Sequence, residues 1–289
     1  TSADYPPFEF INEANDFDGF DIALIREIGN RLGLRVEIRD MAFDGLIAAL
    51  RAGQINAIIA AMSATPERAQ QVDFTINYFV GTDAILVAEG SGLAFEDALE
   101  IASYRVGVQT GTIHEQWVEE NLIDAGLLTS ANFTRYERAE QAILDLRNGR
   151  IDVVAMDFFA AKAYLEQGGI VLALEQNLAG ENMAIALPKG ASVFLAEMNA
   201  VIQELQAEGF VDQLAEQYLA GEAVEEEPIL SDPTWDAIQE AGVIVVGTSA
   251  DYPPFEFINE ANDFDGFDIA LIREIGNRLG LRVEIRDMA

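Results

Sequence analysis

Three polar side chains stand where a protein can hold a small charged molecule. Arg68, in the block MSATPER, carries a guanidinium that can grip a carboxylate through two parallel hydrogen bonds. Thr112 stands where the loop TGT enters a predicted helix, and helix N-termini attract anions. Asp157 ends the predicted strand IDVVAM, and ligands of open α/β sheets bind beyond the carboxyl ends of strands. Each residue also has a plain structural interpretation: a surface arginine, a turn threonine and a helix N-cap.

The sequence offers little for catalysis or for metal binding. It contains no cysteine and a single histidine, His114, which we expect on the solvated side of a helix. It has no Ser-His-Asp order and no phosphate-binding glycine loop. NEANDFDGFD looks superficially like a calcium loop, but with Gly19 in the glycine position the first and twelfth ligand positions fall on Ala14 and Ile25. We therefore expect no catalytic residue, no cofactor and no metal.

Helical and strand patterns alternate along the chain, which predicts a mostly parallel sheet. Helices are expected at 19–33, 43–52, 113–121, 139–148, 192–208 and 210–219, with a further helix beginning at 65–70. Strands are expected at 34–40, 55–62, 104–109, 133–137, 151–156, 170–174 and 182–187. The middle of the chain looks inserted into an outer domain, with two crossings near 82–87 and 182–187. Two such crossover strands make a natural hinge.

An identical repeat complicates this organisation. Residues 1–42 and 248–289 are the same without one change, at an offset of 247. An acidic, proline-containing linker (GEAVEEEPILSDP), a short helix (TWDAIQEAG) and a β-branched strand (VIVVG, 243–247) precede the second copy. We therefore predict an outer lobe at 1–83 and 184–222, an inserted lobe at 84–183, linker and helix at 223–241, and at 242–289 a strand with the second copy. We expect that last part to pack as the start of a neighbouring unit, by exchange or in a continuing chain.

The charge balance argues against two classes of binding partner. There are 50 Asp plus Glu against 17 Lys plus Arg, a formal net charge of −33. Nucleic acid and anionic membrane surfaces would repel such a chain. No apolar run approaches the roughly 20 residues that span a bilayer. No signal peptide stands at Thr1, so we expect either a mature secreted form or a cytosolic protein.

Six sequence blocks together resemble a known family, the polar amino-acid-binding proteins that serve ABC importers (extracellular solute-binding family 3). The blocks are VIVVGTSADYPPFEF, GFDIALIREIGNRLGL, AAMSATPERAQQVDFT, VGVQTGT, GRIDVVAMD and AIALPKG. The resemblance implies an α/β fold of the periplasmic-binding-protein type II, with two doubly wound lobes joined by two hinge strands. It also implies a non-enzymatic protein, periplasmic or extracellular and either free or lipid-anchored, that hands an amino acid to importer membrane subunits.

The resemblance also assigns roles in a ligand site. It implies that Arg68 binds the ligand carboxylate and that Asp157 accepts its ammonium. Ser63 and Thr112 match positions that offer hydroxyls and backbone N–H groups to the ligand. Aromatic positions that flank the ligand side chain match Tyr5, duplicated as Tyr252, and Phe43. Ala61 and Gln109 complete the predicted ligand-binding set.

The positions that differ among family members with different ligands say less about which amino acid binds here. Ser2 stands where the family often has an aspartate for a basic side chain, which weakens the case for lysine or ornithine. No spare cation is evident for glutamate or aspartate. With Gln109 and the acidic field, arginine and glutamine remain joint favourites, ahead of histidine. Other variable family positions are Asp4, Ile113 and Met156.

Three other functions share features with this sequence. A cyclohexadienyl-dehydratase-like enzyme has the same fold, but would not need both Arg68 and Asp157 arranged for an amino acid. A receptor sensor domain would require a membrane helix or kinase region. A structural or filamentous array, held by head-to-tail self-association, is suggested by the repeat.

Overall fold

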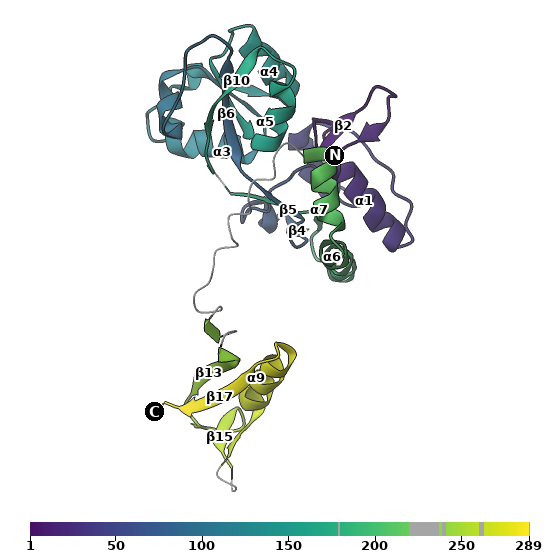
Figure 1. Ribbon diagram of the computed structural model, residues 1–289, viewed down its shortest axis with the longest axis vertical. Helices are drawn as coiled ribbons and strands as arrows, with labels where there is room; N and C mark the ends of the chain where they lie inside the picture. Colours follow the sequence, from purple (N-terminus) through teal and green to yellow (C-terminus); the bar gives the residue numbers. More distant parts are fainter. Residues whose placement is uncertain (179, 220–236, 239–240, 260–262, 289) are drawn as a thin grey trace. The chain divides into compact units, whose positions relative to one another are not determined.

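The computed structural model describes residues 1–178, 180–219, 237–238, 241–259 and 263–288, and it divides into two compact units (Figure 1). Unit 1 is Thr1–Gly221 and unit 2 is Glu222–Ala289. The predicted linker and most of the short helix TWDAIQEAG lie outside the described residues. Unit 1 carries the predicted site.

A five-stranded sheet forms the centre of one half of unit 1, which we call the inserted lobe (residues 83–178). Its strand order is β10-β6-β9-β7-β8. The strands are β6 (Asp83–Ala88), β7 (Val106–Gln109), β8 (Phe133–Tyr136), β9 (Val153–Asp157) and β10 (Ile170–Glu175). β7 runs parallel to β8 and β9, whereas β6 runs antiparallel to β9 and β10. The sheet is therefore mixed rather than mostly parallel.

Helices cover both faces of this sheet, and two apolar clusters fill the layers between. One cluster includes Ile143 and Leu146 of α4 (Ala139–Arg147) together with residues of α5 (Phe158–Leu165). The other involves α3 (Ile113–Val118) and the short helices η3 (Ala98–Ser103) and η4 (Glu119–Ile123). A further short helix, η5 (Ser130–Asn132), precedes β8 and has no buried residue. The inserted lobe is thus doubly wound, as the sequence predicts.

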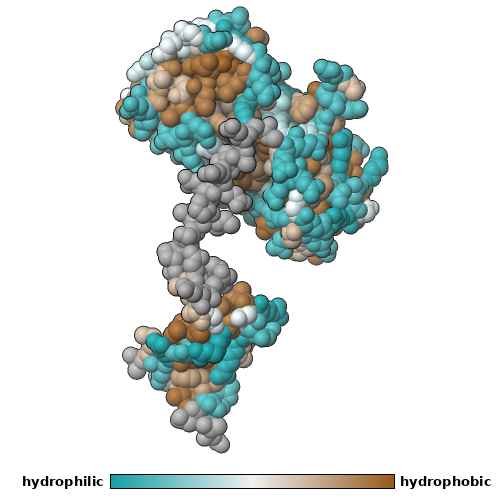
Figure 2. All heavy atoms as spheres, in the orientation of Figure 1, coloured by the Kyte–Doolittle hydropathy of each residue, from teal (hydrophilic) through white to brown (hydrophobic). Residues whose placement is uncertain are grey.

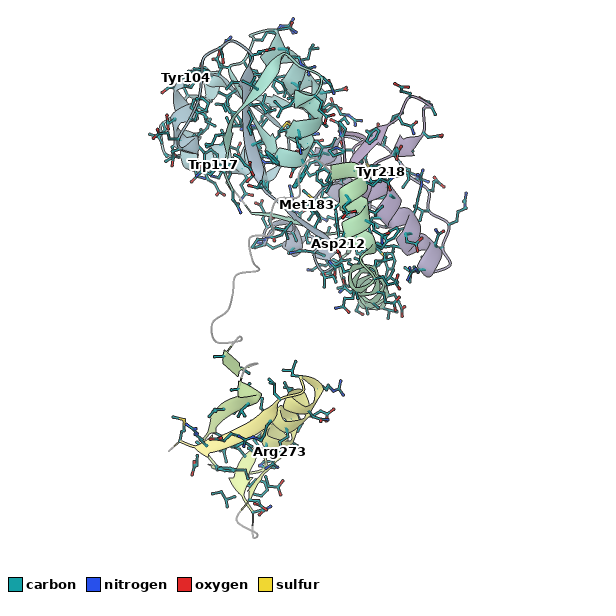
Figure 3. All side chains as sticks on the ribbon, viewed as in Figure 1. Tyr104, Trp117, Met183, Asp212, Tyr218 and Arg273 are labelled. Atoms are coloured by element: carbon teal, nitrogen blue, oxygen red, sulfur yellow. The ribbon has the colours of Figure 1, made fainter. Side chains whose placement is uncertain are left out.

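The outer lobe, residues 1–81 and 181–219, is built around helix α1 (Phe20–Arg31). Phe20, Leu24 and Ile28 form its buried stripe, and Met183 lies in the same core near α7 (Figure 3). The Tyr218 hydroxyl donates to Asp18 at 3.0 Å and ties the last helical turn of unit 1 to β3. The other elements are β1 (Asp4–Tyr5), β2 (Glu9–Ile11), β3 (Phe17–Asp18), η1 (Phe43–Gly45), α2 (Leu46–Arg51), η2 (Arg68–Gln70), β4 (Val72–Phe74), β12 (Ala186–Pro188), α6 (Ser192–Ala207), α7 (Phe210–Leu214) and η6 (Ala215–Leu219).

Two short strands connect the lobes side by side. β5 (Phe79–Gly81) pairs antiparallel with β11 (Glu181–Met183). The prediction for the first crossing, 82–87, is a few residues late, because β6 already belongs to the sheet of the inserted lobe. One connection runs from β4 to β6 and the other from β10 to β12. Among the described residues of these two connections, the pairing of β5 with β11 is the only ladder.

Two predicted strands of the outer lobe do not form. Residues 34–40 have no regular secondary structure and pair with no strand among the described residues, and 55–62 contribute only an isolated bridge from Ile58 to Ala186. A strand exists only through its ladder of backbone hydrogen bonds, so a correct strand pattern without a partner stays unpaired. The helix predicted from 65–70 is reduced to η2.

Unit 2 shows the same sequence with a partner. β13 (Val243–Thr248) runs parallel to β17 (Arg282–Asp287), which repeats residues 35–40. Between them lie β14 (Asp251–Tyr252), β15 (Glu256–Ile258), β16 (Phe264–Asp265) and helix α9 (Phe267–Arg278). Apolar side chains reach the surface of this unit (Figure 2), Phe267 being 64% exposed against 0% for its copy Phe20.

Candidate functional site

A small cavity of about 20 Å³ lies inside unit 1 with walls from both lobes. Seven of the eight predicted ligand-binding residues line it: Tyr5, Phe43, Ala61, Ser63, Arg68, Gln109 and Thr112. Ser2, Glu9, Ala60, Ile113 and His114 complete the lining. A space of this size holds about one water. The lobes must therefore separate before a molecule as large as an amino acid can enter.

Arg68 is held at the cavity by carbonyls of both lobes. It is 9% exposed and belongs to η2, whose first turn is supported by the Thr65 hydroxyl accepting from the Arg68 backbone N–H at 3.2 Å. Its guanidinium donates to the Ser63 carbonyl at 2.7 Å and to the Gly111 carbonyl at 2.8 Å. It also lies 5.5 Å from the centre of the Phe43 ring. The cation is thus oriented and largely removed from water, which strengthens its pull on an anion.

The loop around Gly111 closes the cavity from the inserted lobe. Gly111 has φ = +81°, and a Cβ atom there would lie 3.1 Å from the Cα of Asp44 in the outer lobe. The following Thr112 caps α3: its hydroxyl accepts from the Glu115 N–H at 3.2 Å and donates to the Gln109 carbonyl at 2.8 Å. The Thr112 side chain therefore shapes this loop, as the turn interpretation expects.

Asp157 lies just behind the cavity wall. It does not line the cavity, but its backbone N–H donates to the hydroxyl of Tyr5, which does, at 3.1 Å. Its Oδ1 accepts from the Ala160 N–H at 2.8 Å as the N-cap of α5, while Oδ2 is buried with no hydrogen-bond partner among the described residues. Burial, with a smaller contribution from the neighbouring Asp83 carboxylate, raises the pKa of Asp157 to about 8.

Sequence reasoning missed a second buried acid, Glu9. It lies between two phenylalanines in the first hairpin, and both of its carboxyl oxygens are buried in the lining of the cavity. The nearby Asp21 carboxyl accepts from the Ala61 N–H at 2.7 Å and from the Tyr78 hydroxyl at 2.9 Å. Burial raises the pKa of Glu9 well above its ordinary value and that of Asp21 to about 7. The only sequence signal was an acid inside an apolar block.

The expectation for His114 is wrong. It is 3% exposed, lines the cavity, and its Nε2 lies 2.7 Å from Oδ1 of the fully buried Asp83. Asp83 begins β6 and its other oxygen accepts from the Leu178 N–H at 2.6 Å. A buried carboxylate needs polar partners, and the ring of His114 supplies one.

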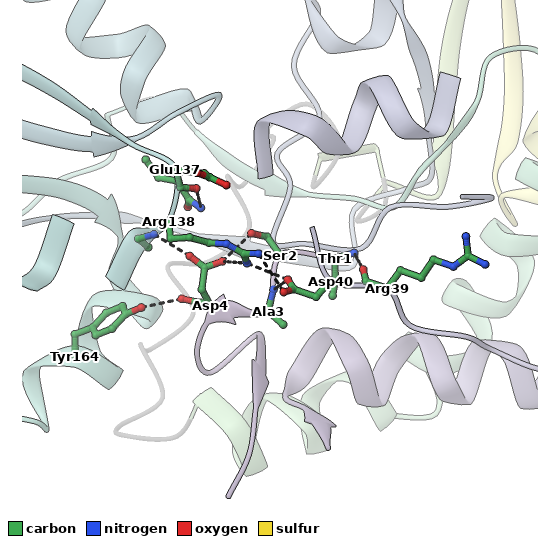
Figure 4. A network of polar contacts seen from close by, with 11 residues as sticks. Thr1, Ser2, Ala3, Asp4, Arg39, Asp40, Glu137, Arg138 and Tyr164 are labelled. Atoms are coloured by element: carbon green, nitrogen blue, oxygen red, sulfur yellow. Dashed lines mark hydrogen bonds and ion pairs between the residues drawn. The ribbon is translucent and has the colours of Figure 1, made fainter. Parts of the chain in front are cut away.

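A polar network fastens the lobes beside the cavity (Figure 4). Arg138 of the inserted lobe donates to both oxygens of Asp40, at 2.9 and 3.0 Å, and to Asp4 at 3.1 Å. The other oxygen of Asp4 accepts from the Ala139 N–H at 2.8 Å, and the Ser2 hydroxyl donates to Asp4 at 2.7 Å. The two specificity candidates Ser2 and Asp4 thus take part in lobe closure.

Two lobes that close on a cavity lined from both sides define a two-lobed ligand-binding protein. A sequence model of the bacterial extracellular solute-binding proteins, family 3, matches residues 1–221 and 244–289, and the chain belongs to that family. Its type II periplasmic-binding-protein fold follows from this membership and from solved structures.

Individual relatives agree with this assignment. The arginine-binding extracellular protein ArtP of Bacillus subtilis is 29% identical over 77% of this chain and 85% of its own. A solved ancestral arginine-binding protein bound to arginine is 35% identical, covering 76% of this chain and 96% of its own with a TM-score of 0.70. The same kind of ancestral protein bound to glutamine is 34% identical, covering 75% and 94%, with a TM-score of 0.69. These relatives are binding proteins, and the chain is a solute-binding protein rather than an enzyme.

The described residues contain neither a metal-ion cluster nor a membrane-spanning helix. No cluster of three or more His, Asp or Glu side chains suited to a metal ion occurs among them. Within the same residues, every helix is too short or too polar to cross a bilayer.

Proposed function

We propose that this protein binds a free polar or basic L-amino acid, arginine or glutamine, in the cavity between its lobes and delivers it to an ABC importer. The observation that carries the proposal is a buried guanidinium, Arg68, facing one cavity that the buried acid Glu9 also lines, with Asp157 directly behind. A guanidinium and two buried carboxyl groups at one cavity suit a zwitterion, because the ligand's ammonium favours the ionised form of a nearby carboxyl.

Each group of the ligand has a matching partner. The carboxylate takes the two guanidinium hydrogen bonds that Arg68 now gives to carbonyls, and the ammonium takes the free Oδ2 of Asp157. The side chain lies between Tyr5 and Phe43 and reaches towards Glu9. Glu9 accepts from a guanidinium when ionised and donates to an amide oxygen when protonated. The two states fit the two favoured ligands, and the two solved ancestral relatives are bound to arginine and to glutamine.

The place of action follows from the family. Membership in an extracellular solute-binding family supports a periplasmic or extracellular location, with the protein free or lipid-anchored. Relatives named for ABC transport, such as an arginine-binding protein of Escherichia coli, support an importer as the partner. The net charge of −33 argues against nucleic acid as a further partner.

A melting experiment tests the proposal. The protein is unfolded and refolded to remove carried-over ligand, and then melted with each L-amino acid. Arginine or glutamine at about 100 times its dissociation constant should stabilise the fold by roughly 2.7 kcal/mol. D-amino acids should give no shift. If no proteinogenic amino acid raises the melting temperature, the proposed function is wrong.

Two substitutions locate the site within the same assay. Arg68→Ala and Asp157→Ala should each cost about 2–5 kcal/mol of binding, because each leaves a ligand charge buried without its partner. Arg51→Ala is the matched control, since Arg51 is exposed and donates only to the Gln71 side chain at 2.9 Å. Near-normal affinity in either site variant would remove that residue from the site.

A further inference from the structure

The carboxyl group of Glu9 reaches the cavity from the first hairpin of the outer lobe. Glu9 begins β2 and lies directly opposite Tyr5 of β1 in the antiparallel register, so both side chains leave the hairpin on the same face. Both residues line the cavity. The hairpin therefore holds Glu9 beside the ring of Tyr5, against which the side chain of the proposed ligand lies.

The carboxyl oxygens of Glu9 lack hydrogen-bond donors among the described residues. The residue is 0% exposed, so water does not replace those donors. Among the described residues that line the cavity, Arg68 is the only arginine or lysine, and its guanidinium donates to the Ser63 and Gly111 carbonyls. A buried carboxylate without donors or a nearby cation is less stable than its neutral form, so the ligand-free site favours a protonated Glu9.

Most other charged groups around Glu9 act in the same direction. Asp21 of α1 accepts from a backbone N–H and from a tyrosine hydroxyl, so this second acid has the donors that Glu9 lacks. Burial has the largest effect and raises the pKa of Glu9; the carboxyls of Asp21 and Asp4 raise it further, and the amino group of Thr1 lowers it. The proton of this pair of acids therefore resides on Glu9.

Arginine and glutamine present different groups to that carboxyl. Both carry the same carboxylate and ammonium, so Arg68 and Asp157 meet the same charges whichever amino acid is bound. The guanidinium of arginine is always a cation and has only donors, so it pairs with an ionised carboxylate. The amide of glutamine is neutral, and its oxygen accepts the proton of a neutral carboxyl. Exchanging one ligand for the other is therefore linked to a proton on Glu9.

We propose that Glu9 determines the order of preference between arginine and glutamine through one proton: the protonated acid favours glutamine and the ionised acid favours arginine. This role of Glu9 rests on the proposed function, because it takes the ligand side chain to lie at the Glu9 end of the cavity. Arginine binding releases the proton of Glu9 to solvent, whereas glutamine binding retains it. A rise in pH therefore strengthens arginine binding relative to glutamine binding, by up to about tenfold for each pH unit.

Matched ligands test this role in the full chain. Calorimetric titration gives the affinities of L-arginine, L-glutamine and L-citrulline between about pH 5 and pH 8; citrulline has the length of arginine but a neutral urea group. The ratio of arginine to citrulline affinity should rise by up to about tenfold per pH unit, while the ratio of glutamine to citrulline stays constant. Groups that meet the shared carboxylate and ammonium, Asp157 and His114 included, affect all three ligands alike and cancel in these ratios.

The proton itself can be counted without any substitution. Titrations in buffers of different ionisation enthalpy should show that arginine releases about one proton more than citrulline or glutamine does. Equal proton release by arginine and citrulline would overturn the proposal, and so would a ratio of their affinities that does not change with pH.

Two matched variants connect the proton with Glu9. Glu9→Gln keeps the shape of the protonated acid but cannot ionise, so it should hold the ratio of arginine to citrulline affinity at or below its low-pH value at every pH. Glu13→Gln removes the same charge from the exposed turn after β2 and should keep the full pH dependence. A pH dependence that survives in Glu9→Gln, or that disappears in Glu13→Gln, would overturn the role of Glu9. The proposed function stands in those cases, because the amino acids still bind; if no amino acid binds, both proposals are wrong.

Discussion

Asp157 is a buried carboxyl behind the cavity wall, and its ionisation depends on folding. Its pKa is raised to about 8, mainly by burial, from an ordinary value near 4. A carboxyl with a raised pKa in the folded protein stabilises the fold below its unfolded pKa. That contribution is lost as the pH rises through the folded value. Asp21, raised to about 7 mainly by burial, acts in the same direction.

We therefore predict that the ligand-free protein loses stability between about pH 4 and pH 8. Each 1 kcal/mol lost should lower the melting temperature by about 2–4 °C for a chain of this size. Asp157→Asn should flatten part of the decline, because the amide cannot ionise yet still caps α5. Thermal melts across this range check it. An unchanged pH profile in the variant would show that Asp157 stays ionised.

At the scale of single residues, short motifs identified most of the cavity lining. Ser63 and Arg68 share one block, and Gln109 and Thr112 share another, so a local pattern places each pair. The partnership of His114 with Asp83 joins residues 31 positions apart and depends on how α3 packs against β6. No local pattern contains that information, and a lone histidine was accordingly assigned to solvent.

Among the elements, the loop before α4 does most to hold the lobes together. Arg138 of this loop donates hydrogen bonds from both terminal nitrogens to the carboxylates of Asp4 and Asp40 in the outer lobe. The Tyr164 hydroxyl adds a bond to the Asp4 carbonyl at 2.8 Å. Because these partners come from different lobes, every one of the bonds breaks when the lobes open.

We predict that Arg138→Met opens the ligand-free protein. The variant keeps an apolar stem but removes the hydrogen bonds by which the inserted lobe holds Asp4 and Asp40 of the outer lobe, and these carboxylates then gain hydration when the lobes separate. Small-angle X-ray scattering should show a larger radius of gyration than for the unchanged protein. Arg150→Ala is the control, because that exposed arginine bonds only to Asp145 of its own lobe. Equal radii for all three proteins would rule out the network as a latch.

The repeat also explains, at the scale of elements, why the strand predicted at 34–40 does not form. Residues 35–40 and 282–287 have one sequence, yet only the second set forms a strand, because β13 lies beside it. The alternating pattern correctly reports the capacity to pair. Whether pairing occurs depends on a partner strand elsewhere in the sequence, which the pattern itself does not contain. Helix α1, whose hydrogen bonds are internal, formed as predicted in both copies.

For the whole molecule, the repeat places one helical sequence in two different surroundings. In unit 1, α1 packs against α6 and α7, and its apolar face is buried. In unit 2 the same face of α9 is exposed: Leu271 is 49% exposed against 0% for Leu24. The helix forms in both units because its backbone hydrogen bonds are internal, whereas the burial of its apolar face depends on elements that lie far away in the sequence.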